Sequence, residues 1–505
     1  MKRLFKGLKD DPQSRYDAVI IGAGVGGLVC ANLLARDGLK VLLVEQHYMV
    51  GGYCSTFRRK GYTFDAGTHF YPLLGNPATI TGRLLGQLGV KTGWVKLDPV
   101  DRFHFPDGTS FTVPADFDAY LKKLKSAFPH QAQALDAFFA EVREMYLHGL
   151  LQYFRWRDSP KLRRFAHDSV AQALDRHFQD PKLKLLLTAD CSHWGSPPRR
   201  TSYIFDSMLR LSYFLGNYYP KGGSQAFADE LARCFESRGG HILMSSAVRR
   251  ILAKGGAARG VELETGFRKR RHRVRVRSGL VISNADLIQT YEKMLGPSQV
   301  DGATLQKMRL LRPSFPCYLT HLGLKGVPEE LLRRAQGYYW DDWDPDLVGR
   351  DGLRFKIFCP TLYEPGLARP RHQILIIQKV RDLDYASVGD WAAHKADFER
   401  FVDENLEKAL PGIHRHVEVK LSATALTSHR FTLNHGGAML GWEMSPNQVG
   451  ADRPDNEGPL RNLYCTGHWT QPGGGITPVI VSAMRVAALV RQSRPTLSAT
   501  DTAQP

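Results

Sequence analysis

The sequence predicts an α/β fold with a parallel βαβ unit near the start of the chain and a second domain of α+β type. An apolar run at Ala18–Ile21 is typical of a buried parallel strand. A helical run follows at Leu28–Arg36, and a second apolar strand at Lys40–Val44. Apolar residues recur at helical spacing from 116 to 190, and residues 300–440 combine strands with a helix. These observations indicate two domains, which suits a length of 505 residues.

Three glycines join the first strand to the first helix in the pattern G-x-G-x-x-G, at Gly22, Gly24 and Gly27. Gly22 allows the tight turn, Gly24 lets a pyrophosphate approach the backbone, and Gly27 lets the helix lie close to the strand. The helix N-terminus offers free N–H groups and the positive end of its dipole to phosphates. Glu45 follows the second strand, where its carboxylate can accept both hydroxyls of an adenosine ribose. Together these features predict a dinucleotide site.

The residues after Glu45 indicate which dinucleotide binds. They include the runs Gly51-Gly52-Tyr53-Cys54-Ser55-Thr56-Phe57 and Phe64-Asp65-Ala66-Gly67-Thr68-His69. With these runs the chain resembles the FAD-dependent amine oxidase and phytoene desaturase superfamily, and within it the branch of carotenoid cis-trans isomerases and retinol saturase. The resemblance implies a Rossmann-type FAD-binding domain of the glutathione reductase type, with Gly51 and Gly52 beneath FAD. Phytoene desaturases place an arginine where this chain has Tyr53, which argues against a plain desaturase.

The middle of the chain is expected to cover the substrate. Phe103–Phe111 contains an Asp-Gly turn and predicts a hairpin. The helical segment 116–190 predicts a cap of the kind that covers apolar substrates. The stretch Cys191–Arg200 closes this cap and resembles a stretch of retinol saturase-like proteins, and an aromatic cluster follows over 203–219. By resemblance, the turn at Tyr219 crosses beside the flavin ring.

Two later segments return to the cofactor domain. The helix Leu231–Gly239 and the strands that follow it up to Ser283 form one of them. The resemblance implies a backbone contact from Val248 to the adenine. It also implies flavin contacts at the start of the C-terminal helix, from Gly467, Gly475 and Ile476. The acid that commonly follows the strand-end glycine of this superfamily is His468 here, and Thr477 is a candidate cap of the helix.

We therefore expect a discontinuous FAD-binding domain at 12–90, 216–300 and 441–492. The α+β substrate domain with its helical cap takes 91–215 and 301–440, and 493–505 is expected to be a disordered tail. Within the substrate domain the predicted strands are Cys317–Leu322, Gln373–Val380 and His416–Leu421, and the predicted helix is Trp391–Leu410. The segment Tyr338–Trp343 is either a pocket wall or a loop, and the loop is the favoured interpretation.

Composition limits the partners and the compartment. The formal net charge is +18, yet no nucleic-acid recognition motif accompanies it, so nucleic acid is not expected as a partner. An anionic membrane surface suits this charge better, with the segments 153–165 and 268–277 as candidates. A core-packed helix with snorkelling arginines is an equal alternative for Tyr146–Phe165, and a solvated strand face is the favoured interpretation of 268–277. No apolar run is long enough to span a bilayer or to act as a signal core, so we expect a cytoplasmic, peripheral protein. Seven scattered cysteines and scattered histidines predict no metal site.

The function expected from these features is FAD-dependent oxidation, reduction or isomerisation of the double bonds of a conjugated isoprenoid, a carotenoid or a retinoid. Flavin N5 would exchange hydride with one carbon while its neighbour gains or loses a proton. His69, Tyr219 and His468 are the candidate catalytic residues, and the electron partner is unknown. Two alternatives stay open: a flavin amine or amino-acid oxidase, and a non-catalytic lipid carrier of the Rab GDP-dissociation inhibitor type, which has the same fold.

Overall fold

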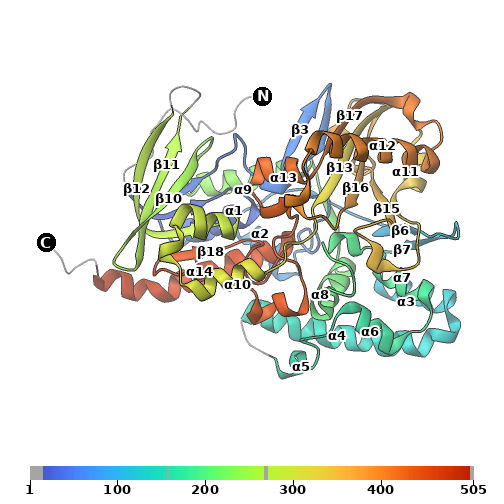
Figure 1. Ribbon diagram of the computed structural model, residues 1–505, viewed down its shortest axis with the longest axis horizontal. Coiled ribbons are helices and arrows are strands. Elements are labelled where there is room, and N and C mark those ends of the chain that lie inside the picture. Colours follow the sequence, from blue (N-terminus) through green and yellow to red (C-terminus); the bar gives the residue numbers. More distant parts are fainter. Residues whose placement is uncertain (1–14, 156–158, 267–270, 501–505) are drawn as a thin grey trace.

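The computed structural model describes residues 15–155, 159–266 and 271–500, which form two large sheets and a layer of helices (Figure 1). The first sheet has the order β10-β11-β12-β1-β2-β9, and β18 pairs with β12. Its strands are β1 (Arg15–Ile21), β2 (Val41–Val44), β9 (His241–Leu243), β10 (Ala247–Lys254), β11 (Ala257–Thr265), β12 (His272–Ser283) and β18 (Leu463–Cys465). β9, β2, β1, β12 and β18 run parallel, whereas β10, β11 and β12 form an antiparallel meander. The predicted parallel βαβ unit is confirmed.

Side chains of β1 alternate between two cores, because successive residues of a strand point to opposite faces. Ala18 and Ile20 pack in the core formed with helices α1 (Val25–Arg36), α9 (Ser224–Glu236) and α14 (Ile476–Thr500). Val19 and Ile21 pack on the other face, in a core that includes residues of the β10–β12 meander. The cofactor domain is thus covered on both faces, as parallel sheets require.

The second sheet has the order β17-β13-β16-β15-β14-β6-β7. Its strands are β6 (Asp101–His104), β7 (Ser110–Val113), β13 (Cys317–Lys325), β14 (Gly337–Trp340), β15 (Leu353–Phe358), β16 (His372–Val380) and β17 (Val417–Ala423). Neighbouring strands are antiparallel except β14 and β6. Helices α11 (Glu329–Ala335) and α12 (Trp391–Ala409) lie beside this sheet (Figure 1). The expected strands, the hairpin and the α+β character are confirmed.

The expected helical cap is also present, and it forms a separate layer against one end of the second sheet (Figure 1). It consists of α3 (Phe117–Ala127), α4 (Ala132–Arg155), α5 (Pro160–Arg163), α6 (Val170–His177), α7 (Pro181–Thr188) and α8 (Tyr203–Phe214). Two small sheets lie outside the two large ones: β3 (Thr56–Arg59) pairs with β4 (Tyr62–Asp65), and β5 (Trp94–Lys96) pairs with β8 (Tyr218–Pro220). Further helical elements include α2 (Ile80–Gln87), α10 (Gly302–Leu310), α13 (Ala425–Thr432), the π-helix Gln289–Leu295 and the 3₁₀ turn η3 (Cys191–His193).

Two expectations differ from the structure. The segment 338–343 was expected to be a loop, but Gly337–Trp340 is strand β14 and Tyr338 is fully buried, because its aromatic side chains fit the sheet interior. The tail was expected to be disordered from residue 493, but α14 continues to Thr500, and 501–505 lie outside the described residues. The domain boundaries themselves stay a prediction.

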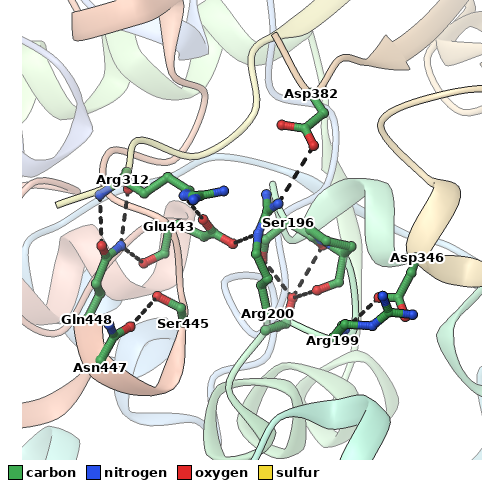
Figure 2. Close-up of polar contacts among 12 residues, drawn as sticks. Ser196, Arg199, Arg200, Arg312, Asp346, Asp382, Glu443, Ser445, Asn447 and Gln448 are labelled. Atoms are coloured by element: carbon green, nitrogen blue, oxygen red, sulfur yellow. Dashed lines mark hydrogen bonds and ion pairs between the residues drawn. The ribbon is translucent and has the colours of Figure 1, made fainter. Parts of the chain in front are cut away.

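A buried carboxylate joins the end of the cap to two loops of the substrate domain. The Glu443 side chain is 1% exposed, its Oε1 accepts from Nε of Arg200 at 2.8 Å, and its Oε2 lies 3.7 Å from Nε of Arg312 (Figure 2). Arg200 also lies 3.6 Å from Asp382. Gln448 donates to the carbonyls of both Arg312 and Glu443, at 3.1 Å. The stretch that closes the cap therefore has a structural role through Arg200.

We expect Glu443→Ala to lower the free energy of unfolding by about 2–3 kcal/mol, because the variant removes charge-assisted hydrogen bonds inside the protein. Glu330→Ala is the matched control. Glu330 accepts from Arg334 at 2.9 Å, but its side chain is 67% exposed, so its loss should cost at most about 0.5 kcal/mol. Urea denaturation of both variants measures the two values. Equal losses would contradict a tethering role for Glu443.

Candidate active site

Two adjoining cavities lie between the sheets. The larger has a volume of about 790 Å³ and extends along the carboxyl ends of β1 and β2, from Gly22 and Glu45 to Gly475. The smaller, of about 260 Å³, lies between the second sheet and the cap helices α4 and α8. The residues that line both cavities are Tyr53, Ala66, Thr68, Leu319, Ser428, Met439, Leu440, Gly475 and Ile476. A ligand in the larger cavity can therefore meet a ligand in the smaller one.

The glycine loop forms one wall of the larger cavity. Gly22 has a φ of +93°, which a side chain would strain. A Cβ at Gly27 would lie 2.1 Å from the carbonyl oxygen of Gly22, so Gly27 permits the close packing of α1 on β1, and it does not line the cavity. A Cβ at Gly24 would meet only the side chain of Asn284, at 3.1 Å. Gly24 therefore leaves free space on the cavity side, and, unlike at Gly27, close packing of the backbone does not require glycine here.

The N-terminus of α1 points its unpaired backbone N–H groups at this wall. Gly24 is the N-cap residue and makes no side-chain cap bond. The first N–H groups of any helix lack partners within the helix. An anion such as a pyrophosphate satisfies both these groups and the positive end of the helix dipole. The geometry therefore fits the phosphates of a dinucleotide.

Glu45 is held rigidly beside the loop. Its Oε2 accepts from the backbone N–H of Ala23 at 2.7 Å, and its Oε1 accepts from that of His47 at 2.8 Å. Burial raises the pKa of Glu45, while these backbone donors act in the opposite direction. A carboxylate has about four acceptor positions, so two bonds leave capacity for ribose hydroxyls.

The other sequence-predicted cofactor residues line the same cavity. They are Gly51, Gly52, Val248, Gly467, Gly475 and Ile476. A Cβ at Gly467 would lie 2.7 Å from Oδ1 of Asn284, so this glycine makes room for a neighbouring side chain. Helix α14 begins at Ile476, and Thr477 does not cap it as expected: its hydroxyl donates to the carbonyl of Pro72 at 2.8 Å. The N-terminus of α14 therefore faces the junction of the cavities, where it suits an anionic group.

The sequence pattern did not single out Asn284, although it predicted a strand that ends one residue earlier, at Ser283. Asn284 follows β12, its N–H donates to the carbonyl of Ile21 at 2.8 Å, and its side chain lies among Gly22, Gly24, Gly26 and Gly467. It thereby connects the glycine loop to the C-terminal segment. The signal in the sequence was its position directly after a central parallel strand, because ligands bind at the carboxyl ends of such strands.

Of the three candidate catalytic residues, His69 is the one that lines the smaller cavity. Its Nδ1 lies 3.0 Å from the carbonyl of Gly67 and 3.1 Å from Nε2 of Gln378. Its Nε2 is buried and has no hydrogen-bond partner among the described residues. Burial and the nearby Lys356 lower the pKa of His69 to about 3. The imidazole is therefore neutral at physiological pH.

The other two candidates lie elsewhere. Tyr219 is fully buried, lines neither cavity, and donates from its hydroxyl to Oδ2 of Asp65. The same carboxylate accepts from the N–H of Ser224, at the start of α9, so Tyr219 belongs to a structural contact between β8 and β4. His468 lines the larger cavity, with its Nε2 at 3.3 Å from Oδ1 of Asn434. Burial lowers the pKa of His468 to about 3, so this ring is also neutral.

The structure also places a buried lysine beside the smaller cavity, which the sequence pattern did not single out. Lys356 on β15 lies within hydrogen-bond distance of Asp101, His193 and Tyr338. These three neighbours come from three other segments, β6, η3 and β14, so no sequence motif marks the group. Among the described residues, no group of three or more His, Cys, Asp or Glu side chains could hold a metal ion.

Comparisons with known proteins agree with this geometry. The family model described as flavin containing amine oxidoreductase matches residues 25–491. The chain is 29% identical to the zeta-carotene-forming phytoene desaturase of Myxococcus xanthus, over 93% of this chain and 92% of that protein. It is 30% identical to the chloroplastic prolycopene isomerase 2 of an Oncidium hybrid cultivar, over 95% of this chain and 85% of that protein.

A solved structure shares the fold. The crystal structure of an oxidoreductase from Methanosarcina mazei superposes with a TM-score of 0.64 at 18% identity, and the match covers 93% of this chain and 99% of that one. The expected FAD-binding domain with a second, substrate domain is therefore confirmed as the fold class. Because the family model spans nearly the whole chain, this protein belongs to the flavin-containing amine oxidoreductase family and is an FAD-dependent oxidoreductase.

Proposed function

We propose that this enzyme acts on the conjugated double bonds of an isoprenoid, a carotenoid or a retinoid. The observation that carries the proposal is the junction of the larger cavity, which fits a dinucleotide, with a second cavity whose wall is apolar. The described residues that line the smaller cavity include no Asp, Glu, Lys or Arg. Apolar burial stabilises a bound chain by about 25 cal/mol per Å² and needs no charged anchor. The two carotenoid-related relatives support the same substrate class.

In this proposal the larger cavity holds FAD. Gly22, Gly24 and the N-terminus of α1 hold the pyrophosphate, Glu45 holds the ribose, and the backbone at Val248 contacts the adenine. Gly51 and Gly52 lie along the nucleotide, and Gly467, Gly475 and Ile476 lie at the ring end. When bound, the flavin supplies hydride exchange with the substrate. The residues of the chain bind the polyene beside the ring, orient it and exclude water.

An amine or amino-acid oxidase is the weaker alternative. A buried ammonium or carboxylate substrate needs an opposite charge or a strong hydrogen-bonding group in its pocket. The wall of the smaller cavity offers rings, aliphatic side chains and neutral polar groups. The lipid-carrier alternative is not retained, because the chain belongs to a family of flavin enzymes.

The glycine assignment predicts that Gly24→Ala folds but loses its flavin. Gly24 has φ −66° and ψ 171°, which alanine adopts without strain, and only the Asn284 side chain lies near the added methyl. A pyrophosphate in contact with the backbone would meet that methyl directly. Visible absorbance after purification, together with the thermal midpoint of the flavin-free protein, measures both effects.

Gly86→Ala is the matched control. A Cβ at Gly86, inside α2, has no atom within 4 Å, so this variant should keep both its flavin and its stability. Full flavin content in Gly24→Ala would show that the phosphates lie elsewhere.

The substrate assignment predicts turnover of a polyene and not of an amine. Oxidised and reduced enzyme are each incubated with carotenoids, with retinol and with primary amines. The polyene spectrum should change, because altering a conjugated double bond shifts its absorption, and no peroxide should form from amines. Peroxide release from an amine, with every polyene unchanged, would favour the oxidase instead.

We also propose a peripheral contact with an anionic membrane through the C-terminal half of α4. No charged residue occurs between Glu144 and Arg155. Tyr146, Leu150 and Tyr153 line the smaller cavity, while Leu147 and Leu151 are 64% and 49% exposed. A helix that is apolar on the solvent side as well as on the core side suits a lipid interface.

The basic residues of α5 and its end lie next to this helix in the chain. Lys161 and Arg164 have side chains that are 62% and 77% exposed, and they pair with Glu144 at 2.6 Å and with Glu141 at 4.0 Å. In the other candidate segment, 268–277, Arg273 and Arg275 of β12 both pair with Glu262. Residues 267–270 lie outside the described part of the chain, so the proposal rests on α4 and α5. In the described residues no helix is both long and apolar enough to cross a membrane.

This contact predicts that the enzyme floats with anionic liposomes at low salt. Flotation should fade at 1 M salt, where the Debye length is about 3 Å. A Leu147→Asp, Leu151→Asp double variant should float less at every salt concentration. Leu310→Asp is the control, because Leu310 is 79% exposed at the end of α10, a helix that contributes no residue to the wall of the smaller cavity. Absence of flotation at low salt would remove the membrane from this proposal.

A further inference from the structure

A buried group of titratable side chains lies behind the wall of the smaller cavity. The Lys356 side chain is 1% exposed, and its Nζ lies 2.8 Å from Oη of Tyr338, 3.1 Å from Oδ2 of Asp101 and 3.2 Å from Nε2 of His193. Oη of Tyr338 lies 3.0 Å from Nδ1 of His193. Since an ammonium only donates, Nε2 of His193 accepts from Lys356, and Nδ1–H is left to donate to Tyr338.

His193 stands between this lysine and the cavity. His193 lines the cavity wall and Lys356 does not. The strand register agrees, because Lys356 pairs with Gln378 of β16, which also lines the cavity. Nζ of Lys356 lies 3.8 Å from the ring centroid of Phe70, another wall residue. The ammonium is thus one side chain away from a bound substrate.

A purely structural lysine in the same sheet looks different. Lys379 of β16 is also buried, but its Nζ donates to the backbone carbonyls of Arg350, Leu353 and Arg354. Its neighbours Gln378 and Val380 line the cavity, so Lys379 points to the opposite face of the strand. The hydrogen-bond partners of Lys356 are, in contrast, all side chains that can exchange protons.

The proton affinities of the group suit exchange near neutral pH. Burial lowers the pKa of Lys356 to about 8 and raises the pKa of Asp101 to about 6, so the two form an ion pair between these values. Burial, followed by the charge of Lys356, lowers the pKa of His193 well below its usual range. The carboxylates of Asp101 and Asp190 act on the pKa of Lys356 in the raising direction, with smaller effects than burial.

Other titratable groups on the cavity wall are poor proton sources. The pKa of His69 is lowered to about 3, and its hydrogen-bond partners, the carbonyl of Gly67 and the amide of Gln378, cannot resupply a proton as Lys356 can for His193. Burial raises the pKa of the Cys317 thiol and of the Tyr153 hydroxyl, each to about 12, and raises that of Tyr213 well above its usual range.

We propose that His193 is the catalytic acid–base residue of the smaller cavity and that Lys356, paired with Asp101, supplies and recovers its proton. This inference rests on the proposed function, in which one carbon of a double bond exchanges hydride and the neighbouring carbon exchanges a proton. Lys356 is a positioning residue that acts through His193.

The steps balance in the saturating direction. One carbon of a double bond would receive the hydride that a bound, reduced flavin supplies. The other carbon takes the Nδ1 proton of His193, which otherwise donates to Tyr338, and Nζ of Lys356 passes a proton to Nε2 of the same ring. Lys356 ends neutral beside Asp101 and regains a proton from solvent. Desaturation runs through the same groups in reverse. An isomerisation has no net proton exchange, so the relay favours oxidation or reduction over isomerisation.

The test compares pH profiles of polyene turnover in wild type, Lys356→Arg, Lys356→Met and Lys379→Met. In wild type and Lys379→Met the turnover rate should change with an apparent pKa near 8, which forms one limb of the pH profile. The rate of saturation should fall above this pH, and the rate of desaturation should rise as the pH approaches it. Lys356→Arg should lack this limb, because a guanidinium does not titrate there. Lys356→Met should lose about 10²–10⁴-fold in rate, the usual contribution of a general acid or base.

A second readout needs no turnover. Carbon NMR of protein labelled at lysine Cε should show a signal that titrates near pH 8 and that disappears in Lys356→Arg but remains in Lys379→Met. Wild-type turnover with the same limb in Lys356→Arg would overturn the relay and leave the proposed function intact. No turnover of any polyene by wild type would overturn the proposed function, and the relay with it.

Discussion

The close approach of α1 to the turn after β1 is the constraint on which the active site depends. A side chain at Gly27 would run into the carbonyl oxygen of Gly22, so only glycine lets the helix lie at this depth. Helix α1 is buried along almost its whole length and shares a core with α9 and α14. Its position fixes where its N-terminus ends, and with it the place where phosphates can bind.

The same packing brings the start of α14 to the edge of the sheet. Gly467 follows β18, whose register with β12 places it beside Asn284 and the glycine loop. Two helix N-termini therefore border one cavity, from segments more than 400 residues apart in the chain. An anionic ligand with two separated polar ends suits this arrangement, whereas the second cavity offers no charge to such a ligand.

The second sheet holds charged side chains directly behind the apolar wall of the smaller cavity. Lys356, Asp101 and Tyr338 satisfy one another and leave mainly rings and aliphatic groups toward the cavity. An unpaired charge at this depth would be strongly destabilising, and pairing removes most of that cost. The charged groups are therefore held behind the wall, and the cavity side keeps mainly apolar groups.

Local patterns in the sequence were sufficient for the cofactor half of this protein. The glycines lie close to Glu45 and to the strands around them in the sequence. The turn and the close backbone approach at these positions can be made by only a few residue types. The amphipathic spacing of 116–190 also predicted the cap.

The role of Tyr219 could not be predicted in this way, because its hydroxyl pairs with Asp65 from a distant hairpin. The burial of Tyr338 and the surroundings of Lys356 could not be predicted either. The two residues lie on β14 and β15, and their shared partners come from β6 and η3, which are distant in the sequence. The sequence by itself determined which ligand class binds, since local backbone geometry encodes it. Only the tertiary structure decided which side chains face the substrate cavity, since strand register and long-range packing set their burial and their charge.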